Sequence, residues 1–421
     1  MATMPENHQK LHFGPARTEL HVGVDLDRMR RERADRMRAL MRSKGIPALL
    51  LTGADNVRYL TGFWWGEFSL QVGYALFFAD DEPIVFAPAG SLQQMPDQAP
   101  WIKHWRPAIS WLGGVAPSSA IAELSAVFAA QIRDELAARS LAGERLAVSE
   151  IDEPGMNALA DAGIETIPGL PLLLECSTIK TADEISCISM AASLSTAGFE
   201  ATRAALRPGT KQAQIALMAR RAIEDAGAEV GAARLLSGPL SFPRGISGGD
   251  RIVEHGDLAY LLTCGTSYMG YTACLYRQYV VGRAPTSAER SSYTKLTDRL
   301  DLAMSLMKPG ASTADVAAVL APAEDLGFPS EAECFSIELG HGIGLVNAGS
   351  RAIHYNPPTI TRSWSLAHPE EIKEGMVIAI EGIEGEHRVG GVRLENLVVV
   401  TANGAELLDH YPRLDMVQTA G

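Results

Sequence analysis

A change of pattern well before the middle of the chain constrains the fold more than any other feature of this sequence. Before it, apolar runs of strand length alternate with segments of helical periodicity; after it, long helices and long strands follow one another. The segment 168–171 reads Pro-Gly-Leu-Pro, a typical turn, and Thr181 with Glu184 gives the capping-box pattern of a helix start. The 421 residues also exceed what one hydrophobic core usually organises. We therefore predict two domains, residues 1–178 and 179–421.

The first predicted domain has the pattern of a small α/β fold. Apolar residues at helical spacing over 25–44 are followed by a buried strand at 48–52. Strands that alternate with helices in this way indicate an α/β domain. Further strands are predicted at 74–79, 83–87 and 146–149, and a further helix at 120–138.

The second predicted domain contains a helix-and-sheet module twice, which indicates an α+β fold with an internal pseudo-repeat. A helix that starts at Thr181 precedes an antiparallel hairpin, with strands at 257–263 and 271–282. The later module has helices that start at Thr286 and Thr313 and strands at 376–381 and 392–401.

The charge balance limits the partners of this protein. Its 37 Lys and Arg against 50 Asp and Glu give a formal net charge of −13, which disfavours nucleic acids and anionic membranes as main partners. Apolar runs such as 48–51 and 376–380 are too short to span a bilayer. The polar segment 1–10 has no apolar core of a signal peptide. We expect a cytoplasmic protein whose partner is a small-molecule substrate.

The cysteines are odd in number and scattered, with no CxxC pair. This pattern is typical of reduced thiols in a cytoplasm rather than of a disulfide framework. The five residues are Cys176, Cys187, Cys264, Cys274 and Cys334.

Three side chains in the second domain indicate chemistry. His341 lies between glycines in the segment 340–345, where the backbone can approach a ligand closely. Glu381 and Glu395 interrupt apolar strands, where an unpaired carboxylate would be costly. Two carboxylates on neighbouring strands can share a metal or a proton, or divide the roles of acid and base. We therefore expect these three side chains in one catalytic site.

The order of these motifs resembles the creatinase, prolidase and aminopeptidase P family. The run 256–282 resembles the first metal-bearing hairpin of that family. The segments 340–345, 374–376 and 394–396 and the residue Glu381 resemble its later motifs, in the same order. The resemblance implies an N-terminal creatinase-like α/β domain followed by a C-terminal pita-bread catalytic domain. It also implies a homodimer.

The resemblance also reveals what this chain lacks. Family peptidases hold two metal ions with two Asp on the hairpin, one His and two Glu. The two Asp positions correspond to Thr263 and Cys274 here, whereas the His and both Glu are matched. A two-metal site needs bridging carboxylates, so it is poorly supported, and we predict no bound metal.

Cys274 has three roles open to it. As a thiolate beside His341 it can attack a substrate, with an adjacent Glu to orient the imidazole. As a buried side chain it can simply fill space. It can also help to hold one metal ion, because zinc accepts sulfur, nitrogen and oxygen donors. The ligands of such an ion would be Cys274, His341, Glu381 and Glu395.

Alternation along the strands predicts where the neighbours of Cys274 point. Cys264 directly follows Thr263 and is expected to face away from the site as a structural residue. Tyr276 should share the face of Cys274, where it either donates a proton or packs as an aromatic ring. Arg277 should point away and form a structural ion pair.

A substrate carboxylate would be bound by arginine, whose planar fork suits it. Arg393 is two residues from Glu395 and either binds the substrate or neutralises that Glu. Two further histidines of the family are missing, because their positions correspond to Gly245 and Ala348. The predicted substrate-binding residues are Arg244, Arg393, Tyr276, His354 and Trp65.

Together these observations favour a metal-independent, creatinase-like hydrolase of a C–N bond in a small polar substrate that carries a carboxylate. Two alternatives stay open. One is a single-metal hydrolase or lyase similar to an Xaa-Pro dipeptidase, and the other is a non-catalytic, ligand-binding homologue of the pita-bread peptidases. The predicted catalytic residues are His341, Glu381, Glu395 and Cys274.

Overall fold

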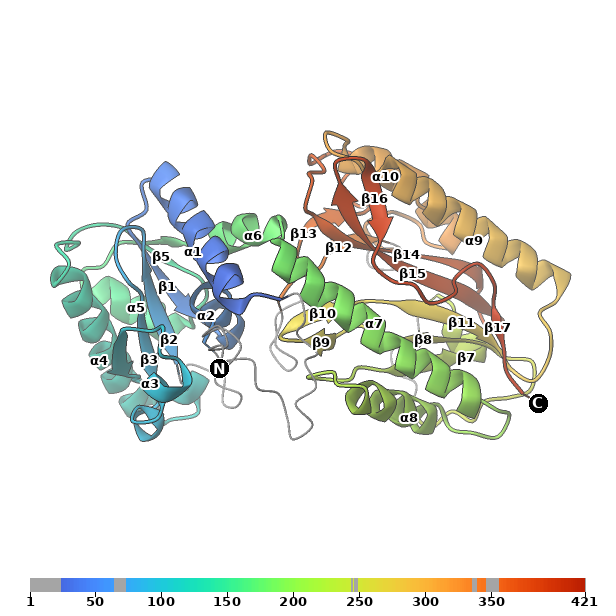
Figure 1. Cartoon of the computed structure of the whole chain (residues 1–421), viewed down its shortest axis with the longest axis horizontal. Helices are drawn as coiled ribbons and strands as arrows, with labels where there is room; N and C mark the ends of the chain where they lie inside the picture. The colour runs from blue at the N-terminus through green and yellow to red at the C-terminus, as the bar shows by residue number, and fades with distance from the viewer. Residues whose placement is uncertain are drawn as a thin grey trace, which may run out of the picture.

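The computed structural model describes residues 24–63, 73–243, 245, 249–334, 339–345 and 356–420. Two large sheets lie at opposite ends of the molecule (Figure 1). The chain passes from one to the other through α6 (Leu170–Thr178) and α7 (Ala182–Ala205).

The first sheet has six strands in the order β4-β3-β2-β1-β5-β6. β2 is antiparallel to both of its neighbours, and the other pairs are parallel. Every residue of β1 is buried, because side chains of α1, α2 and α6 cover one face of the sheet and those of α4 and α5 cover the other. The strands are β1 (Ala48–Thr52), β2 (Tyr74–Phe78), β3 (Ile84–Ala87), β4 (His104–Pro107), β5 (Leu146–Val148) and β6 (Thr166–Pro168). The helices are α1 (Leu26–Ser43), α2 (Ala54–Thr61), α3 (Met95–Gln98), α4 (Ser118–Ala137) and α5 (Glu153–Asp161), with short 3₁₀ helices η2 (Ala89–Ser91) and η3 (Leu112–Gly114).

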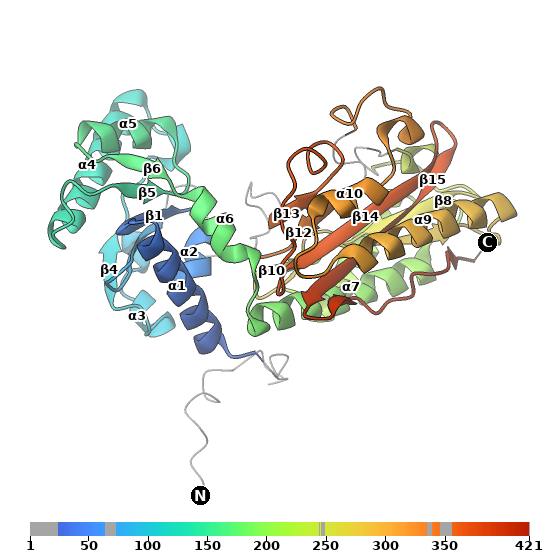
Figure 2. The ribbon, with the colours of Figure 1, turned by 90° about the horizontal axis from the view of Figure 1, so that it is seen from above.

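The second sheet follows the order β13-β12-β14-β15-β11-β8-β7, with β16 beside β15 and β17 beside β11. α7 and α8 share one apolar core with the sheet, and α9 and α10 share another, with α9 lying along β14 and β15 (Figure 2). The strands are β7 (Arg234–Ser237), β8 (Leu258–Leu262), β11 (Tyr276–Val280), β12 (Gly340–Gly342), β13 (Asn356–Ile360), β14 (Val377–Glu386), β15 (Gly390–Thr401), β16 (Gly404–Leu407) and β17 (Val417–Gln418), and β9 (Thr266–Tyr268) and β10 (Tyr271–Ala273) form a separate ribbon. The helices are α8 (Gln212–Asp225), α9 (Ser287–Leu306) and α10 (Thr313–Val319), with η4 (Gly238–Ser241) and η5 (Ala323–Leu326).

The helix starts follow from local hydrogen bonding. Thr181 accepts a bond from the backbone N–H of Glu184 at 3.2 Å, and the Glu184 carboxylate accepts one from the N–H of Thr181 at 2.7 Å. Thr286 and Glu289 form the same reciprocal cap on α9. Both capping boxes confirm the predicted starts. Across the described ranges, none of the helices has the length and apolar character needed to cross a membrane.

A buried chain of polar side chains joins the two halves of the molecule. Arg33 on α1 donates from Nη1 to the Tyr271 hydroxyl at 2.6 Å, and that hydroxyl donates to Glu184 Oε1 at 2.9 Å. All three residues are at most 2% exposed, so the bonds form away from water. The strand β10, which begins at Tyr271, is thereby held against α1 and α7.

Candidate functional site

The two predicted glutamates lie directly opposite each other. β14 and β15 pair without interruption from Val377↔Val399 to Glu386↔Gly390, and Glu381 pairs with Glu395 in this register. Directly opposite residues point to the same face of a sheet. Glu381 is 1% exposed and Glu395 is 0% exposed. Two carboxylates this close and this buried need a positive charge or a proton between them.

Arg393 supplies the positive charge. Its Nη2 donates to Glu381 Oε2, and its guanidinium lies over the ring of Tyr276, 4.6 Å from the ring centroid. Burial alone would lower the pKa of Arg393, but the Glu381 carboxylate and Tyr276 raise it well above its ordinary value. We expected Arg393 to bind a substrate or to neutralise Glu395. The structure pairs it instead with Glu381, across the two strands.

Glu395 has a raised pKa. Burial raises its pKa from 4.5 to about 7, against the opposing effect of a hydrogen bond with His341. The two side chains meet at 3.5 Å, between His341 Nε2 and Glu395 Oε1. His341 Nδ1 lies 3.1 Å from the carbonyl oxygen of Gly342, which can only accept, so Nδ1 carries a proton. In the neutral imidazole, Nε2 therefore has a lone pair that can accept the proton of the Glu395 carboxyl, whereas the imidazolium donates from Nε2 to the carboxylate, which is the hydrogen bond that opposes the rise in the pKa of Glu395.

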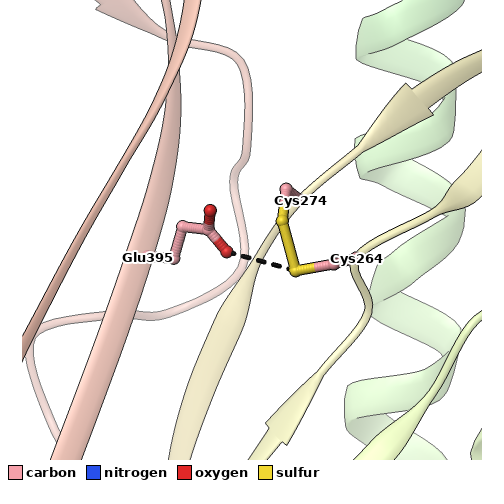
Figure 3. A group of neighbouring side chains, drawn as sticks. All are labelled: Cys264, Cys274 and Glu395. Atoms are coloured by element: carbon pink, nitrogen blue, oxygen red, sulfur yellow. Dashed lines mark hydrogen bonds between the residues drawn. A yellow bond between two sulfur atoms is a disulfide. The ribbon is translucent and has the colours of Figure 1, made fainter. Parts of the chain in front are cut away.

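The hairpin contributes a disulfide rather than a thiolate. β8 and β11 pair antiparallel with Leu262 opposite Tyr276, and the same register places Cys264 opposite Cys274 two residues further on. These two cysteines are bonded to each other (Figure 3). In this form Cys274 has no thiolate with which to attack a substrate or bind a metal.

Two predictions about the cysteines are therefore wrong. Cys264 faces Cys274 instead of pointing away, because alternation from Thr263 says nothing about which residue lies across the hairpin. The expectation that all thiols are reduced fails for this pair. The cysteines outside the disulfide are Cys176, Cys187 and Cys334, and all three are buried.

The hairpin changes register just beyond the disulfide. The ribbon β9–β10 pairs Thr266 with Ala273, which is one residue out of step with the pairing of β8 and β11. Gly265 absorbs the extra residue with a φ of +97°, in the left-handed region that glycine adopts without strain. This bulge ends the simple alternation of side chains next to the site.

Glu395 also contacts the disulfide. Cys264 Sγ lies 3.5 Å from Glu395 Oε2. The two sulfurs and one carboxylate oxygen of Glu395 all lie within 4.8 Å of one another (Figure 3). One carboxylate oxygen thus faces the sulfurs, while the other faces His341.

Of the remaining predicted residues, one lies in the site, one forms an ion pair outside it, and several lie outside the described residues. Tyr276 packs in the site against Arg393, and Arg277 forms the expected structural ion pair, in which its Nη2 donates to Asp409 Oδ1. At Gly245, an added Cβ would lie 2.8 Å from the backbone oxygen of Leu240, so this backbone leaves no room for the histidine of the family. Arg244, His354, Trp65 and Ala348 lie outside the described residues.

The family can be decided by comparison with known proteins. Residues 186–402 match the sequence profile "Metallopeptidase family M24", and residues 33–150 match "Creatinase/Prolidase N-terminal domain". The chain belongs to metallopeptidase family M24. The predicted creatinase-like α/β domain and pita-bread domain are confirmed by these matches.

Several relatives of this M24 chain are named as peptidases, a class of hydrolases, and one, from Rhizobium rhizogenes, is named as an agropine synthesis cyclase at 24% identity over 391 residues, which cover 87% of this chain and 92% of that protein. Peptidase YqhT of Bacillus subtilis is 23% identical over 384 residues, which cover 90% of this chain and 98% of that protein. The Xaa-Pro dipeptidase of Pyrococcus furiosus is 28% identical over 235 residues, which are 55% of this chain and 62% of that protein. The structure of dipeptidase PepE from Mycobacterium ulcerans has a TM-score of 0.74 at 24% identity, covers 94% of this chain and 100% of that one, and supports the fold.

The side chains of this M24 member do not fit a two-metal centre. Thr263 offers no anionic oxygen, and the Cys274 sulfur is bonded to another sulfur. Arg393 already occupies one oxygen of Glu381. What the described residues offer is a proton-transfer pair, Glu395 and His341, beside a neutralised carboxylate.

Proposed function

We propose that this chain hydrolyses the C–N bond of a short peptide or peptide-like amide, without a two-metal centre and with Glu395 and His341 moving the protons. Its membership of family M24 and its peptidase relatives support the class of bond. The relative from Pyrococcus furiosus is named for Xaa-Pro dipeptides, so these are the first substrates to test.

The observation that carries this proposal is the contact between Glu395 and His341. Near neutral pH the carboxyl, with its pKa of about 7, holds a proton in part of the molecules, and the imidazole tautomer with its proton on Nδ1 has a lone pair on Nε2. A general acid works best when its pKa lies near the working pH. Arg393 keeps Glu381 neutralised, so Glu395 is left as the acid.

The proton steps balance with these two residues. His341 Nε2 takes a proton from water as the water oxygen bonds to the carbonyl carbon, and Glu395 gives its proton to the departing nitrogen as the C–N bond breaks. His341 then returns a proton to Glu395 across the 3.5 Å contact, which restores the starting state. No charge has to leave the buried site during the cycle.

The test is a single substitution measured on chelator-treated protein. Glu395→Gln keeps the shape of the side chain but removes the titrating group, so kcat should fall by about 10² to 10⁴ with Xaa-Pro dipeptides or simple amides. Glu386→Gln, an exposed glutamate at the end of the same strand pair, is the matched control and should leave kcat unchanged.

Two outcomes would overturn the proposal. Equal turnover by Glu395→Gln and wild type would remove Glu395 from the chemistry. Tight ligand binding with no turnover of any peptide or amide would support the non-catalytic alternative. The homodimer and the cytoplasmic location stay predictions, and sedimentation of the purified chain would test the first.

A further inference from the structure

The disulfide faces a carboxylate that has no hydrogen bond to gain from it. A disulfide sulfur carries no proton, yet Glu395 Oε2 lies 3.5 Å from Cys264 Sγ. Buried carboxylate oxygens are normally paired with a donor or a cation. The same oxygen would have such a partner if the sulfurs were thiolates that shared a cation with it.

We propose that Cys264, Cys274 and Glu395 form a mononuclear site for a thiophilic divalent cation of the zinc class, and that the disulfide is its oxidised, closed state. Two thiolates and one carboxylate oxygen are donors that zinc accepts. This donor set differs from the one expected from the sequence, because it includes Cys264 and leaves out His341 and Glu381.

The geometry of the donor atoms fits such an ion. With Zn–S and Zn–O bonds of about 2.3 and 2.1 Å in a tetrahedron, a sulfur and an oxygen ligand lie about 3.6 Å apart. The observed distance between Cys264 Sγ and Glu395 Oε2 is 3.5 Å. All three donor atoms lie within 4.8 Å of one another, and binding an ion requires the two bonded sulfurs to move apart. Three protein ligands leave the fourth position open, as in catalytic zinc sites.

The neighbours of the cluster assign the ligands. Glu381 is excluded because its carboxylate accepts from Arg393. His341 contacts Oε1 of Glu395, the oxygen that does not face the sulfurs, so it orients this ligand from behind. Such supporting contacts typically change metal affinity by about 10- to 100-fold. His341 is therefore a positioning residue for the metal.

A dithiol reductant can convert the disulfide form into the metal-binding form, with electrons and protons in balance. The reductant attacks the Cys264–Cys274 bond, passes two electrons and two protons to the sulfurs and leaves as its own disulfide. The cation then displaces the two thiol protons as it binds. A disulfide oxidant reverses both steps: it takes up two electrons and two protons and becomes a dithiol, while the Cys264–Cys274 bond forms again and the ion leaves.

The full-length chain allows a direct test by binding rather than by turnover, so the result does not depend on the proposed function. Five cysteines less the two in the disulfide leave three alkylatable thiols in the oxidised, denatured protein, and reduction should raise this to five. After removal of metal, the reduced protein should bind about one equivalent of Co²⁺ with a thiolate-to-cobalt charge-transfer band, and Zn²⁺ should displace it. The oxidised protein should show no band.

Variants separate the ligands from the other cysteines. Cys264→Ser should abolish both the disulfide and the cobalt band, whereas Glu395→Gln should keep the disulfide and weaken metal binding by about 100-fold or more. Cys187→Ala, which removes a buried thiol outside the cluster, should keep both. The proposal is overturned if reduced wild type shows no thiolate band, or if Cys264→Ser binds cobalt as tightly as wild type.

Discussion

Two parts of the same sheet frame the candidate site, and they differ in both register and chemistry. β14 and β15 pair without interruption and carry Glu381 and Glu395, which match the family motifs. The hairpin of β8 and β11 loses its register at Gly265 and carries Thr263 and Cys274 where the family has Asp. The continuous strand pair thus carries both carboxylates, whereas the hairpin carries a hydroxyl and a sulfur where the family has carboxylates. Alternation along the strand therefore predicts the direction of the side chains on β14 and β15, but not on the hairpin with its change of register.

The largest effect should come from breaking the buried ion pair on the continuous side. Arg393→Met leaves the Glu381 carboxylate buried without its cation, which should lower the free energy of unfolding by about 3–5 kcal/mol. Denaturant unfolding of the oxidised protein measures this change. Adding Glu381→Gln to the same protein removes the orphaned charge and should recover most of the loss. A double variant no more stable than the single one would contradict this account.

A second effect is the pH dependence of stability, which should come from Glu395 and not from the disulfide-bonded cysteines. Its folded-state pKa of about 7 lies above the unfolded value of 4.5, so the folded protein binds this proton more tightly. This contribution to stability is complete below about pH 4.5 and is lost as the pH rises through about 7; at about 1.36 kcal/mol per pKa unit it amounts to about 3 kcal/mol. Unfolding midpoints of the oxidised protein should therefore fall from pH 5 to pH 8. Glu395→Gln should flatten that slope, and an unchanged slope would assign the proton elsewhere.

The smallest effect should come from the bulge. Gly265→Ala places a Cβ on a residue with φ of +97°, at a cost of about 1–2 kcal/mol in the free energy of unfolding. It should also slow re-formation of the disulfide after reduction, because the bulge sets the approach of Cys264. Gly404→Ala, with φ of +120° at the first residue of β16, is the matched control and should cost stability but leave disulfide formation alone. Equal rates of disulfide re-formation in the two variants would show that the bulge does not set the approach of Cys264.

Features that depend on a local sequence pattern could be predicted from the sequence. The buried strand predicted at 48–52 coincides with β1, and the capping boxes at Thr181 and Thr286 start α7 and α9. The three side chains His341, Glu381 and Glu395 do come together. These features depend on periodicity and spacing within one segment or on motifs in a fixed order.

Contacts across strands were harder to predict. The partner of Arg393 was expected two residues along its own strand, but the structure provides Glu381 from the neighbouring strand. The partner of Cys264 was missed for a similar reason, since only the register of β8 with β11 shows which residue it faces. The register of β8 with β11 pairs Cys264 with Cys274, but the register of β9 with β10 differs from it by one residue. The position of the bulge would therefore have been needed to predict this pair from the sequence.

The buried chain from Arg33 through Tyr271 to Glu184 also bears on how the protein can be divided. A fragment cut at the domain boundary would keep the phenol and the carboxylate but lose the guanidinium that belongs to them. The Tyr271 hydroxyl would then keep its bond to Glu184 on α7 but lose the donor that it has in the whole chain. The N-terminal half thus supplies a buried charge with which the C-terminal half pairs, so we expect the C-terminal half to be less stable when it is produced alone.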